Sequence, residues 1–508
     1  EPLRPVVEKK LVVVPVHVEK AATEEPAAPV EKLEPGQLPS HVPYLLIGGG
    51  AASYFAALVI RARDPNAQVL IVSDEMHLPY NRPPLSKELW WYSTERTGEH
   101  LEYKSPTGRT RDVFHEAEGF YVPPHALPAT AHGGVGLVRG RKVVKIDAST
   151  GIATLDNGAT IELYDVVRKG GTPRCLPELQ AAPEGVKRRV LYYRGIDDYR
   201  RLNEEAATAK SITVIGGGLL GSELAYSLKR RYEGQEVNQV LPELGQLAAV
   251  LPEYLSDHAR KEMEKVGINV HAQSRVGAAS EGQDGRVKLS IVRSTLGAEG
   301  KAKEVETDLV VVAIGIEPNE ELARASGFET DPVNGGILAD SEMRVRGSVY
   351  TAGDAASFYD AKLGRRRLGH WENAQVSGRL AGKNMTGGKE AFWYQPSFFT
   401  KIAPMMLLNA VGDTRAEHET KSFFAATESG QKYERGVVFY VKDDKIVGVL
   451  LVNVTGNSID VARRLIDDAV IFDKFDDFRD LARLFPLYEI PEEKKPEPAT
   501  TEGEEKKE

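Results

Sequence analysis

The stretch Ile212-Thr213-Val214-Ile215-Gly216-Gly217-Gly218-Leu219-Leu220-Gly221-Ser222-Glu223-Leu224-Ala225 joins an apolar, β-branched run to a helix-forming segment through the pattern G-x-G-x-x-G. In such a unit Gly216 permits a tight strand-to-helix turn, and Gly218 lets the backbone approach a pyrophosphate. Gly221 allows the helix to pack closely on the strand. The pyrophosphate would then lie on the free amides of the helix N-terminus. The stretch therefore predicts a dinucleotide-binding βαβ unit.

An acidic residue follows this motif at the distance that ribose binding requires. Glu243 comes 22 residues after Gly221, just past a strand expected over Glu236–Leu241. Its carboxylate can accept hydrogen bonds from a ribose, and no Arg follows directly to accommodate a 2′-phosphate. We therefore predict that the unit binds NADH rather than NADPH, through Gly216, Gly218, Leu219, Leu220, Gly221 and Glu243.

A second unit of the same kind begins where the composition changes, at Val42. The segment Val42–Ser53 runs V-P-Y-L-L-I-G-G-G-A-A-S, and a helix is expected over Tyr54–Arg63 and a strand over Gln68–Val72. Acidic residues then stand at the ribose-binding position, at the end of this second strand. The predicted contacts to this second dinucleotide are Gly48, Gly50, Ala51, Ala52, Asp74 and Glu75.

Two such units in one chain are typical of flavoproteins in which the first unit binds FAD and an inserted second unit binds the nicotinamide nucleotide. In that architecture the FAD domain resumes after the insertion. Ser348–Ala356, with the sequence S-V-Y-T-A-G-D-A-A, fits this as a strand that ends in Gly-Asp at an expected helix start. Gly353 would let the backbone approach the ligand, and Asp354 would accept a hydrogen bond from a ribityl hydroxyl.

The predicted fold class is α/β, with two Rossmann-like dinucleotide-binding domains of the glutathione-reductase type and an α+β C-terminal domain. In the C-terminal domain, strands are expected over Arg435–Lys442 and Lys445–Asn453, around the hairpin signal Asp443-Asp444, and helices over Ser458–Asp467 and Asp476–Phe485. The chain starts without Met, so we expect that an upstream leader has been removed. The predicted organisation is a disordered tether at 1–40, an FAD-binding domain at 41–172 and 319–390, an NAD-binding domain at 173–318, the C-terminal domain at 391–487 and a disordered tail at 488–508.

The bulk composition excludes several classes of protein. The formal charge of −9 argues against bulk affinity for nucleic acid, and no apolar run of 18 residues or more predicts a transmembrane helix. Cys175 is the only cysteine, which excludes an intramolecular disulfide, a Cys-rich metal site and an internal redox dithiol within these 508 residues. We expect Cys175 to be a small, partly buried side chain, and we predict no metal site.

One loop makes a family resemblance specific. Leu78–Trp90, with the sequence L-P-Y-N-R-P-P-L-S-K-E-L-W, resembles the R-P-P-L-S-K-x-x-W loop of the apoptosis-inducing factor family. The words at Leu251–Ser256, Lys362–Arg367 and Val376–Gly387 also match, and the resemblance runs from about residue 41 to residue 486. It implies FAD, NADH oxidation, homodimerisation on reduction and residence in the mitochondrial intermembrane space. It also implies respiratory-chain biogenesis through a mitochondrial import oxidoreductase, and release to the nucleus in caspase-independent cell death.

The resemblance also implies roles for single residues. Arg82 and Lys87 would line the flavin, with Lys87 paired to Glu223 near the reactive edge. His370 would stack near flavin and nicotinamide, so the implied catalytic residues are Lys87, Glu223 and His370. The other implied contacts are Val143, Arg194, Trp371 and Phe399 for FAD, and Gly315, His370 and Asn409 for NAD.

The sequence departs from the family at several of these places. Arg168 and Lys169 replace two small residues where the chain passes FAD, and Phe399 stands in place of a Trp. Gly369 and Asn409 replace two acids at the nicotinamide pocket, from which we expect weaker binding of NADH. The remaining departures are Ala249 in place of a Lys, and Pro106 in place of a Trp.

The predicted function is an FAD-dependent NADH oxidoreductase, in which hydride passes from NADH to flavin. Because no second cysteine exists, the electrons must leave to an external acceptor. One alternative is an NADH-sensing redox-switch scaffold that docks a mitochondrial import partner. Another is an electron-transfer flavoenzyme of the ferredoxin or rubredoxin reductase type. DNA binding through Arg365–Arg367 is a weaker hypothesis.

Overall fold

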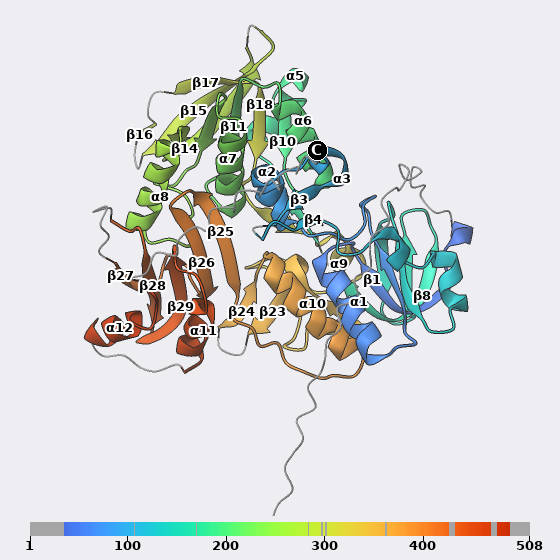
Figure 1. The fold of residues 1–508 in the computed structure, drawn as a ribbon. Coiled ribbons are helices and arrows are strands. Elements are labelled where there is room, and N and C mark those ends of the chain that lie inside the picture. Colours follow the sequence, from blue (N-terminus) through green and yellow to red (C-terminus); the bar gives the residue numbers. More distant parts are fainter. Residues whose placement is uncertain are drawn as a thin grey trace, which may run out of the picture.

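Three sheets of five or more strands organise the described part of this chain (Figure 1). The structure is a computed structural model that describes residues 35–105, 107–168, 170–282, 284–295, 298–299, 302–360, 363–425, 432–468 and 475–487. The expected tether at 1–40 therefore lies mostly outside the described residues, and the expected tail at 488–508 lies wholly outside them. The described part of the chain has no helix whose length and apolar character would allow it to span a membrane.

The first sheet is built from both ends of the predicted FAD segment. Its order is β21-β22-β8-β1-β2-β5, and β6 and β7 extend it beside β8. The strands are β1 His41–Ile47, β2 Gln68–Val72, β5 Gly134–Val138, β6 Val143–Asp147, β7 Ile152–Leu155, β8 Thr160–Arg168, β21 Arg344–Arg346 and β22 Val349–Thr351. Strand β22 pairs in parallel with β8, so the chain returns to the first sheet after the inserted segment.

Two helices from distant parts of the chain pack together on this sheet. They are α1, Ala51–Arg63, and α10, Trp371–Met385, which lie side by side in Figure 1. A Cβ on Gly378 would lie 2.3 Å from the Ala52 carbonyl oxygen, and one on Gly382 would lie 2.6 Å from the Ala56 carbonyl oxygen. The two glycines therefore let the helix backbones approach each other, which holds the start of α10 close to the first Gly-rich turn.

The second sheet is parallel and has the order β10-β18-β11-β12-β13. All residues of β11, Ser211–Ile215, are buried, as expected for a strand in a parallel sheet covered on both faces. The other strands are β10 Val190–Tyr192, β12 Glu236–Val240, β13 Ile268–His271 and β18 Leu309–Val312, and its helices are α6 Ile196–Ala206, α7 Leu219–Arg231 and α8 Glu253–Lys265. An antiparallel group follows β13, made of β14 Ser274–Glu281, β15 Val287–Thr295, β16 Ala298–Glu299 and β17 Lys303–Thr307.

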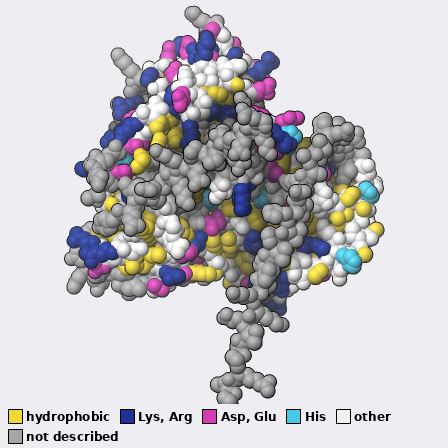
Figure 2. Space-filling model, in the orientation of Figure 1, with side chains coloured by type: hydrophobic (Ala, Val, Ile, Leu, Met, Phe, Trp, Pro, Cys, Tyr) yellow, Lys and Arg dark blue, Asp and Glu magenta, His cyan; other side chains and the backbone are white. Residues whose placement is uncertain are grey.

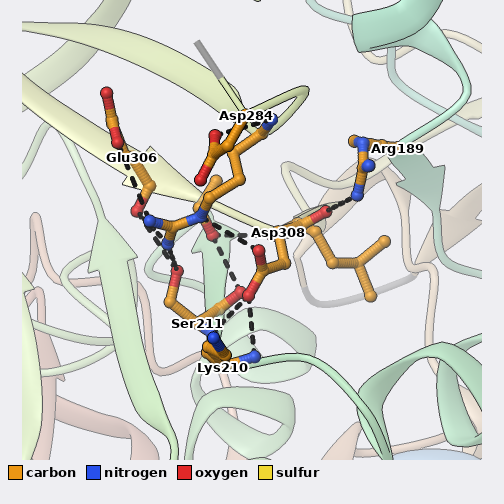
Figure 3. Close-up of polar contacts among 9 residues, drawn as sticks. Arg189, Lys210, Ser211, Asp284, Glu306 and Asp308 are labelled. Atoms are coloured by element: carbon orange, nitrogen blue, oxygen red, sulfur yellow. Dashed lines mark hydrogen bonds and ion pairs between the residues drawn. The ribbon is translucent and has the colours of Figure 1, made fainter. Parts of the chain in front are cut away.

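A polar cluster ties this antiparallel group to the second sheet (Figure 3). The Asp308 carboxylate accepts hydrogen bonds from the amides of Lys210 and Ser211 at 2.7 and 2.9 Å, and from Nε of Arg286 at 3.0 Å. Burial by itself raises the pKa of the Asp308 carboxyl, but these hydrogen bonds and the Arg286 charge outweigh it, so the pKa lies below its usual range. The cluster fixes the link between β17 and β18 against the start of β11.

The third sheet is antiparallel, with the order β25-β26-β29-β28-β27. Its strands are β25 Ser397–Ala403, β26 Met406–Gly412, β27 Glu419–Phe424, β28 Gly436–Lys442 and β29 Lys445–Val452, followed by α11 Ser458–Asp468 and α12 Phe475–Ala482. Asp443 and Asp444 have φ of +51° and +57°, as a tight hairpin turn requires. The hairpin prediction is therefore confirmed, and so is the predicted fold class. The domain boundaries stay predictions.

Short elements connect the sheets. They are η1 Pro35–Gln37, η2 Pro83–Ser86, α2 Glu88–Trp91, α3 Thr97–His100, β3 Glu102–Lys104, β4 Thr110–Asp112, η3 Glu118–Phe120, η4 Pro124–Ala129, β9 Gly171–Pro173, α4 Pro177–Gln180, α5 Glu184–Lys187, β19 Ile316–Pro318, α9 Glu321–Ala325, β20 Ile337–Leu338, η5 Gly353–Ala355, β23 Ala356–Asp360 and β24 Gly364–Arg367. The expected helix start at Gly353-Asp354 is wrong. Only one 3-10 turn follows, because the next residues pair as β23 with β20 and β24.

Candidate functional site

The first Gly-rich turn joins β1 to α1. Gly48 has φ of +100°, and its amide donates to the Val72 carbonyl oxygen at 2.7 Å. No described side chain caps α1 at Gly50, so the first amides of this helix are open to an anionic ligand. A cavity of about 160 Å³ lies against the turn. Its lining includes the predicted residues Gly48, Gly50, Asp74, Glu75, Arg82, Val143 and Arg194.

Two arginines extend this cavity into a longer cleft. Arg82 forms an ion pair with Glu75, and its Nη1 donates to the Arg194 carbonyl oxygen at 3.1 Å. Arg194 in turn donates from Nη2 to Oδ2 of Asp354 at 2.5 Å. Arg82 and Arg194 also line a second cavity, of about 620 Å³, so the two cavities adjoin along these side chains.

A buried ion pair forms one wall of the larger cavity. Lys87 lies between η2 and α2, and its Nζ contacts Oε2 of Glu223, on α7, at 2.6 Å. Only 9% of the Lys87 side chain and 5% of the Glu223 side chain are exposed. The Ser86 hydroxyl also donates to Oε2 of Glu223, at 2.5 Å, and the Thr400 hydroxyl donates to Oε1 at 2.8 Å. The predicted Lys87–Glu223 pairing is therefore present, within a larger set of hydrogen bonds.

The start of α10 faces the same cavity. His370 is the residue before the helix and Trp371 is its first residue, and both line the cavity. Burial, and then the neighbouring charge of Lys87, lower the pKa of His370 below its usual value, which favours a neutral imidazole at pH 7. Nδ1 of His370 and Nε1 of Trp371 are buried without a hydrogen-bond partner among the described residues. These two atoms can therefore serve a bound ligand.

The second Gly-rich turn approaches the cavity from the other side. Gly216 has φ of +124°, and a Cβ on Gly221 would lie 2.3 Å from the Gly216 carbonyl oxygen, so the helix packs directly on the turn. Leu219 and Leu220, the first residues of α7, line the 620 Å³ cavity. Glu243 is exposed, and its carboxylate lies 3.5 Å from the position of a Cβ on Gly217. Gly315, with φ of +100°, follows β18.

The donor set of the cleft fits FAD. The amides at the start of α1, with Arg82 beside them, suit a pyrophosphate, and Asp74 and Glu75 suit ribose hydroxyls. The larger cavity combines apolar walls with the unpartnered ring nitrogens of His370 and Trp371, which suits a flat heterocycle with polar edges. Among the described residues, no group of three or more His, Cys, Asp or Glu side chains could hold a metal ion.

The structure brings most of the predicted residues to this cleft. Ala51, Asp354, Phe399 and Asn409 line the larger cavity, whereas Ala52 is buried beneath the turn and contacts α10. Gly216, Gly218, Gly221, Glu243 and Gly315 belong to the second turn or its neighbourhood and line neither cavity. Their roles, like those of the other site residues, stay predictions.

Several residues that line or support the site were not predicted from the sequence. Ser86 and Thr400 hold Glu223, and the ring of Phe398 lies 6.5 Å from the His370 ring. Lys142 lines the smaller cavity, and Arg463, on α11, lines the larger one. Ser86 lies inside the loop that carries the family resemblance, so it could have been predicted as a site residue. Thr400, Phe398 and Arg463 belong to a domain with no comparable motif.

The structure leaves the departures at Arg168, Lys169 and Pro106 untested and corrects the expectation for Cys175. Lys169 and Pro106 lie outside the described residues, and Arg168 is described only as the last residue of β8, without its side chain. Cys175 is exposed, so the expectation of a partly buried thiol is wrong. It lies on the connection between β9 and α4.

The Arg365–Arg367 run is largely engaged within the fold. Arg365 donates to the Ala339 and Ser357 carbonyl oxygens, and Arg367 donates to the Asn334 carbonyl oxygen at 2.8 Å. Over the second sheet, at the top of Figure 2, Lys and Arg side chains lie among Asp and Glu side chains. The contacts of Arg365 and Arg367 weaken the hypothesis that this run binds DNA, because binding DNA needs cations that are free and gathered on one face.

Family models match most of the chain. The model described as pyridine nucleotide-disulphide oxidoreductase covers residues 42–378. The model described as apoptosis-inducing factor, mitochondrion-associated, C-term, covers residues 413–468. The second match spans β27, β28, β29 and α11, so both the dinucleotide units and the third sheet have counterparts in known families.

Individual proteins are similar over most of the length. A putative apoptosis-inducing factor 1, mitochondrial, from Drosophila melanogaster is 36% identical over 502 residues, which cover 89% of this chain and 66% of the fly protein. Apoptosis-inducing factor 1, mitochondrial, from Dictyostelium discoideum is 33% identical over 83% of this chain and 78% of the relative. The ferredoxin–NAD(+) reductase component of an anthranilate 1,2-dioxygenase system from Burkholderia cepacia is 26% identical over 84% and 94%. A solved ferredoxin reductase from Rhodopseudomonas palustris superposes with a TM-score of 0.69 over 87% of this chain and all of that chain, at 24% identity, which supports the fold alone.

Proposed function

We propose that this chain, which belongs to the apoptosis-inducing factor family within the pyridine nucleotide-disulphide oxidoreductases, oxidises NADH and passes the electrons to an acceptor outside the chain. It is an FAD-dependent NAD(P)H oxidoreductase. The observation that supports this most directly is the cleft that runs from the first Gly-rich turn to the Lys87–Glu223 pair, with the start of α7 on its far side. Bound FAD would supply the two-electron chemistry, since the single cysteine of these 508 residues cannot form an internal redox dithiol.

The protein's own part in this reaction is to bind, orient and polarise. The start of α1 and Arg82 would hold the pyrophosphate, and Asp354 would hold the ribityl chain. The buried ammonium of Lys87, kept in place by Glu223, adds positive potential at one wall of the larger cavity. Neutral His370 can donate or accept a hydrogen bond there without adding charge. No protein nucleophile is needed.

The preference for NADH over NADPH rests on Glu243. Its exposed carboxylate beside Gly217 would accept hydrogen bonds from the ribose and repel a 2′-phosphate. An anaerobic titration with each nucleotide, followed by flavin absorbance, tests the whole proposal. We expect purified protein to carry FAD and to be bleached by NADH at lower concentration than by NADPH. Protein that stays colourless after incubation with FAD would contradict it.

The acceptor is external because these 508 residues contain a single cysteine, and that cysteine is exposed on a connecting segment. A second candidate function, reduction of an iron–sulfur protein, is favoured by the similarity to a ferredoxin–NAD(+) reductase component over 84% of this chain. Steady-state NADH oxidation with a ferredoxin and with a quinone separates the two kinds of acceptor. A ferredoxin that fails to accelerate turnover would argue against the second candidate.

The wider role follows from the relatives only as a proposal. Two of them carry the word mitochondrial in their names, so we propose mitochondrial residence for this protein. Residence in the intermembrane space, homodimerisation on reduction, an import-oxidoreductase partner, respiratory-chain biogenesis and release to the nucleus in cell death remain predictions from the family resemblance. Sedimentation velocity with and without NADH tests the dimer, and fractionation of intact mitochondria tests the compartment.

A further inference from the structure

The carboxylate of Glu223 is held by groups from two other parts of the chain, the loop at Ser86 and Lys87 and strand β25. Lys87 and Ser86 reach its Oε2 from the loop that follows the first dinucleotide unit, at 2.6 and 2.5 Å. Glu223 itself lies on α7, in the second unit, and is 4% exposed. Its other oxygen, Oε1, receives the hydroxyl of Thr400 from the third sheet at 2.8 Å.

Thr400 is placed for this contact by its strand. It lies in the middle of β25, is fully buried, and is opposite Leu408 of β26 in the hairpin register. Because side chains alternate along a strand, Thr400 and Phe398 share one face of β25. The Phe398 ring lies near the His370 ring, so one face of β25 contacts Glu223 through Thr400 and lies near His370 through Phe398.

We propose that Thr400 is a positioning residue for NADH oxidation: its hydroxyl holds the Glu223 carboxylate so that the Lys87 ammonium stays directed at the flavin cavity. This inference rests on the proposed function. A carboxylate can only accept, and all three of its neighbours are donors. Without the Thr400 hydroxyl, Oε1 would be buried and unpaired, and more of the negative charge of the carboxylate would be left uncompensated beside the cavity.

The consequence concerns the electrostatic potential in the cavity. When the charge of Glu223 is compensated by fewer hydrogen bonds, the net potential at a ligand in the cavity is less positive, and the reduced form of bound FAD is stabilised less. Loss of a hydrogen bond to a buried charged group commonly changes an equilibrium by about tenfold or more. A tenfold change in a two-electron equilibrium corresponds to about 30 mV. We therefore expect Thr400→Val to lower the midpoint potential of bound FAD by about 30 mV and to slow its reduction by NADH about tenfold.

The experiment compares FAD-loaded variants of the full chain by spectroelectrochemical titration and by anaerobic stopped flow with NADH. Thr400→Ser keeps the hydroxyl and should restore the wild-type potential, whereas Thr400→Ala loses it and should behave as Thr400→Val does. The Ser and Ala variants both lose the methyl group, so their comparison isolates the hydroxyl even where Thr400→Val folds poorly. Thr420→Val, on β27 of the same sheet and outside the cavity lining, is the matched control.

The outcomes separate this inference from the proposed function. Potentials that agree among wild type, Thr400→Ser and Thr400→Ala would overturn the role of Thr400 while the flavoenzyme stands. A potential that rises in Thr400→Val and Thr400→Ala would overturn the electrostatic argument. Wild-type protein that binds no FAD would instead refute the proposed function. A fall of the potential in Thr400→Ala and its recovery in Thr400→Ser would support the inference.

Discussion

Replacing Lys87 by Met tests whether the buried Lys87–Glu223 ion pair stabilises the folded protein. The substitution roughly preserves the length of the side chain and removes its charge. Glu223 would then lie 4% exposed with only two hydroxyl donors. Removal of one partner from a buried ion pair costs about 3–5 kcal/mol, because the other charge is left uncompensated. We expect the free energy of unfolding to fall by about that amount.

A second substitution and a control make the test specific. In Lys87→Met/Glu223→Gln no uncompensated charge remains, so the double variant should be more stable than Lys87→Met alone. The control is Lys288→Met, which breaks the Lys288–Glu304 pair, at 2.8 Å but with side chains 35% and 62% exposed. That change should cost at most about 1 kcal/mol.

The assay is urea denaturation at one fixed excess of FAD, because binding to the folded state adds to the measured stability. FAD affinity is measured separately by fluorescence quenching, so that a change in ligand binding can be subtracted. If Lys87→Met costs no more than Lys288→Met, burial does not govern the energy of this pair. If the double variant is the least stable of all, the cost does not come from an uncompensated charge.

Three further predictions concern other parts of the fold. Glu243→Ala should raise the KM for NADH about tenfold, because it removes the carboxylate that would accept hydrogen bonds from the ribose hydroxyls, and steady-state kinetics that show an equal rise of the KM for NADPH would contradict the ribose role. Gly378→Ala puts a methyl group 2.3 Å from the Ala52 carbonyl oxygen, so urea denaturation should show a loss of about 1–3 kcal/mol that Gly98→Ala, with open space at its Cβ, does not show. The pKa of Asp308 is lowered, so its contribution to stability is complete above the ordinary carboxyl pKa near 4 and is lost as the pH falls through the folded-state value. Asp308→Asn should therefore lower stability at pH 7 by about 1–3 kcal/mol and make the loss of stability below pH 4 shallower, and parallel pH profiles of stability would refute this.

The dinucleotide cradles could be predicted from sequence because their geometry is local. Gly216 needs its positive φ at the turn, and Gly221 has no room for a Cβ against the Gly216 carbonyl oxygen. Both requirements arise within a few residues of the chain, so the spacing of the motif is enough to predict the turn. The acid at the end of the second strand of each unit follows from the same local geometry. The structure accordingly has both turns where the motifs placed them.

The packing between distant segments could not be predicted in the same way. Gly353-Asp354 was expected to begin a helix because a strand that ends in Gly-Asp fitted the return of the FAD domain after the inserted unit. The following residues pair with β20 and β24 instead, and sheet pairing with partners elsewhere in the chain outweighed the local expectation. In the same way the Arg365–Arg367 run looked like an exposed cationic stripe, yet Arg367 donates to a carbonyl oxygen 33 residues away. Charge along a sequence does not reveal which carbonyl oxygens the fold brings near.

Glu223 shows where these two kinds of information meet. The residue stands inside the motif that decides the fold, and the family resemblance paired it correctly with Lys87. Its third donor, Thr400, lies 177 residues away on β25. The sequence of this strand does not indicate which residue its buried side chains contact. An acid at this position has to be neutralised and hydrogen-bonded, because a buried carboxylate without donors is costly. The third domain supplies the remaining donor, so it must be docked before the wall of the flavin cavity is complete. On the proposed function, β25 is part of the flavin site, and a partner that displaces this strand should change the midpoint potential of bound FAD without contacting FAD itself.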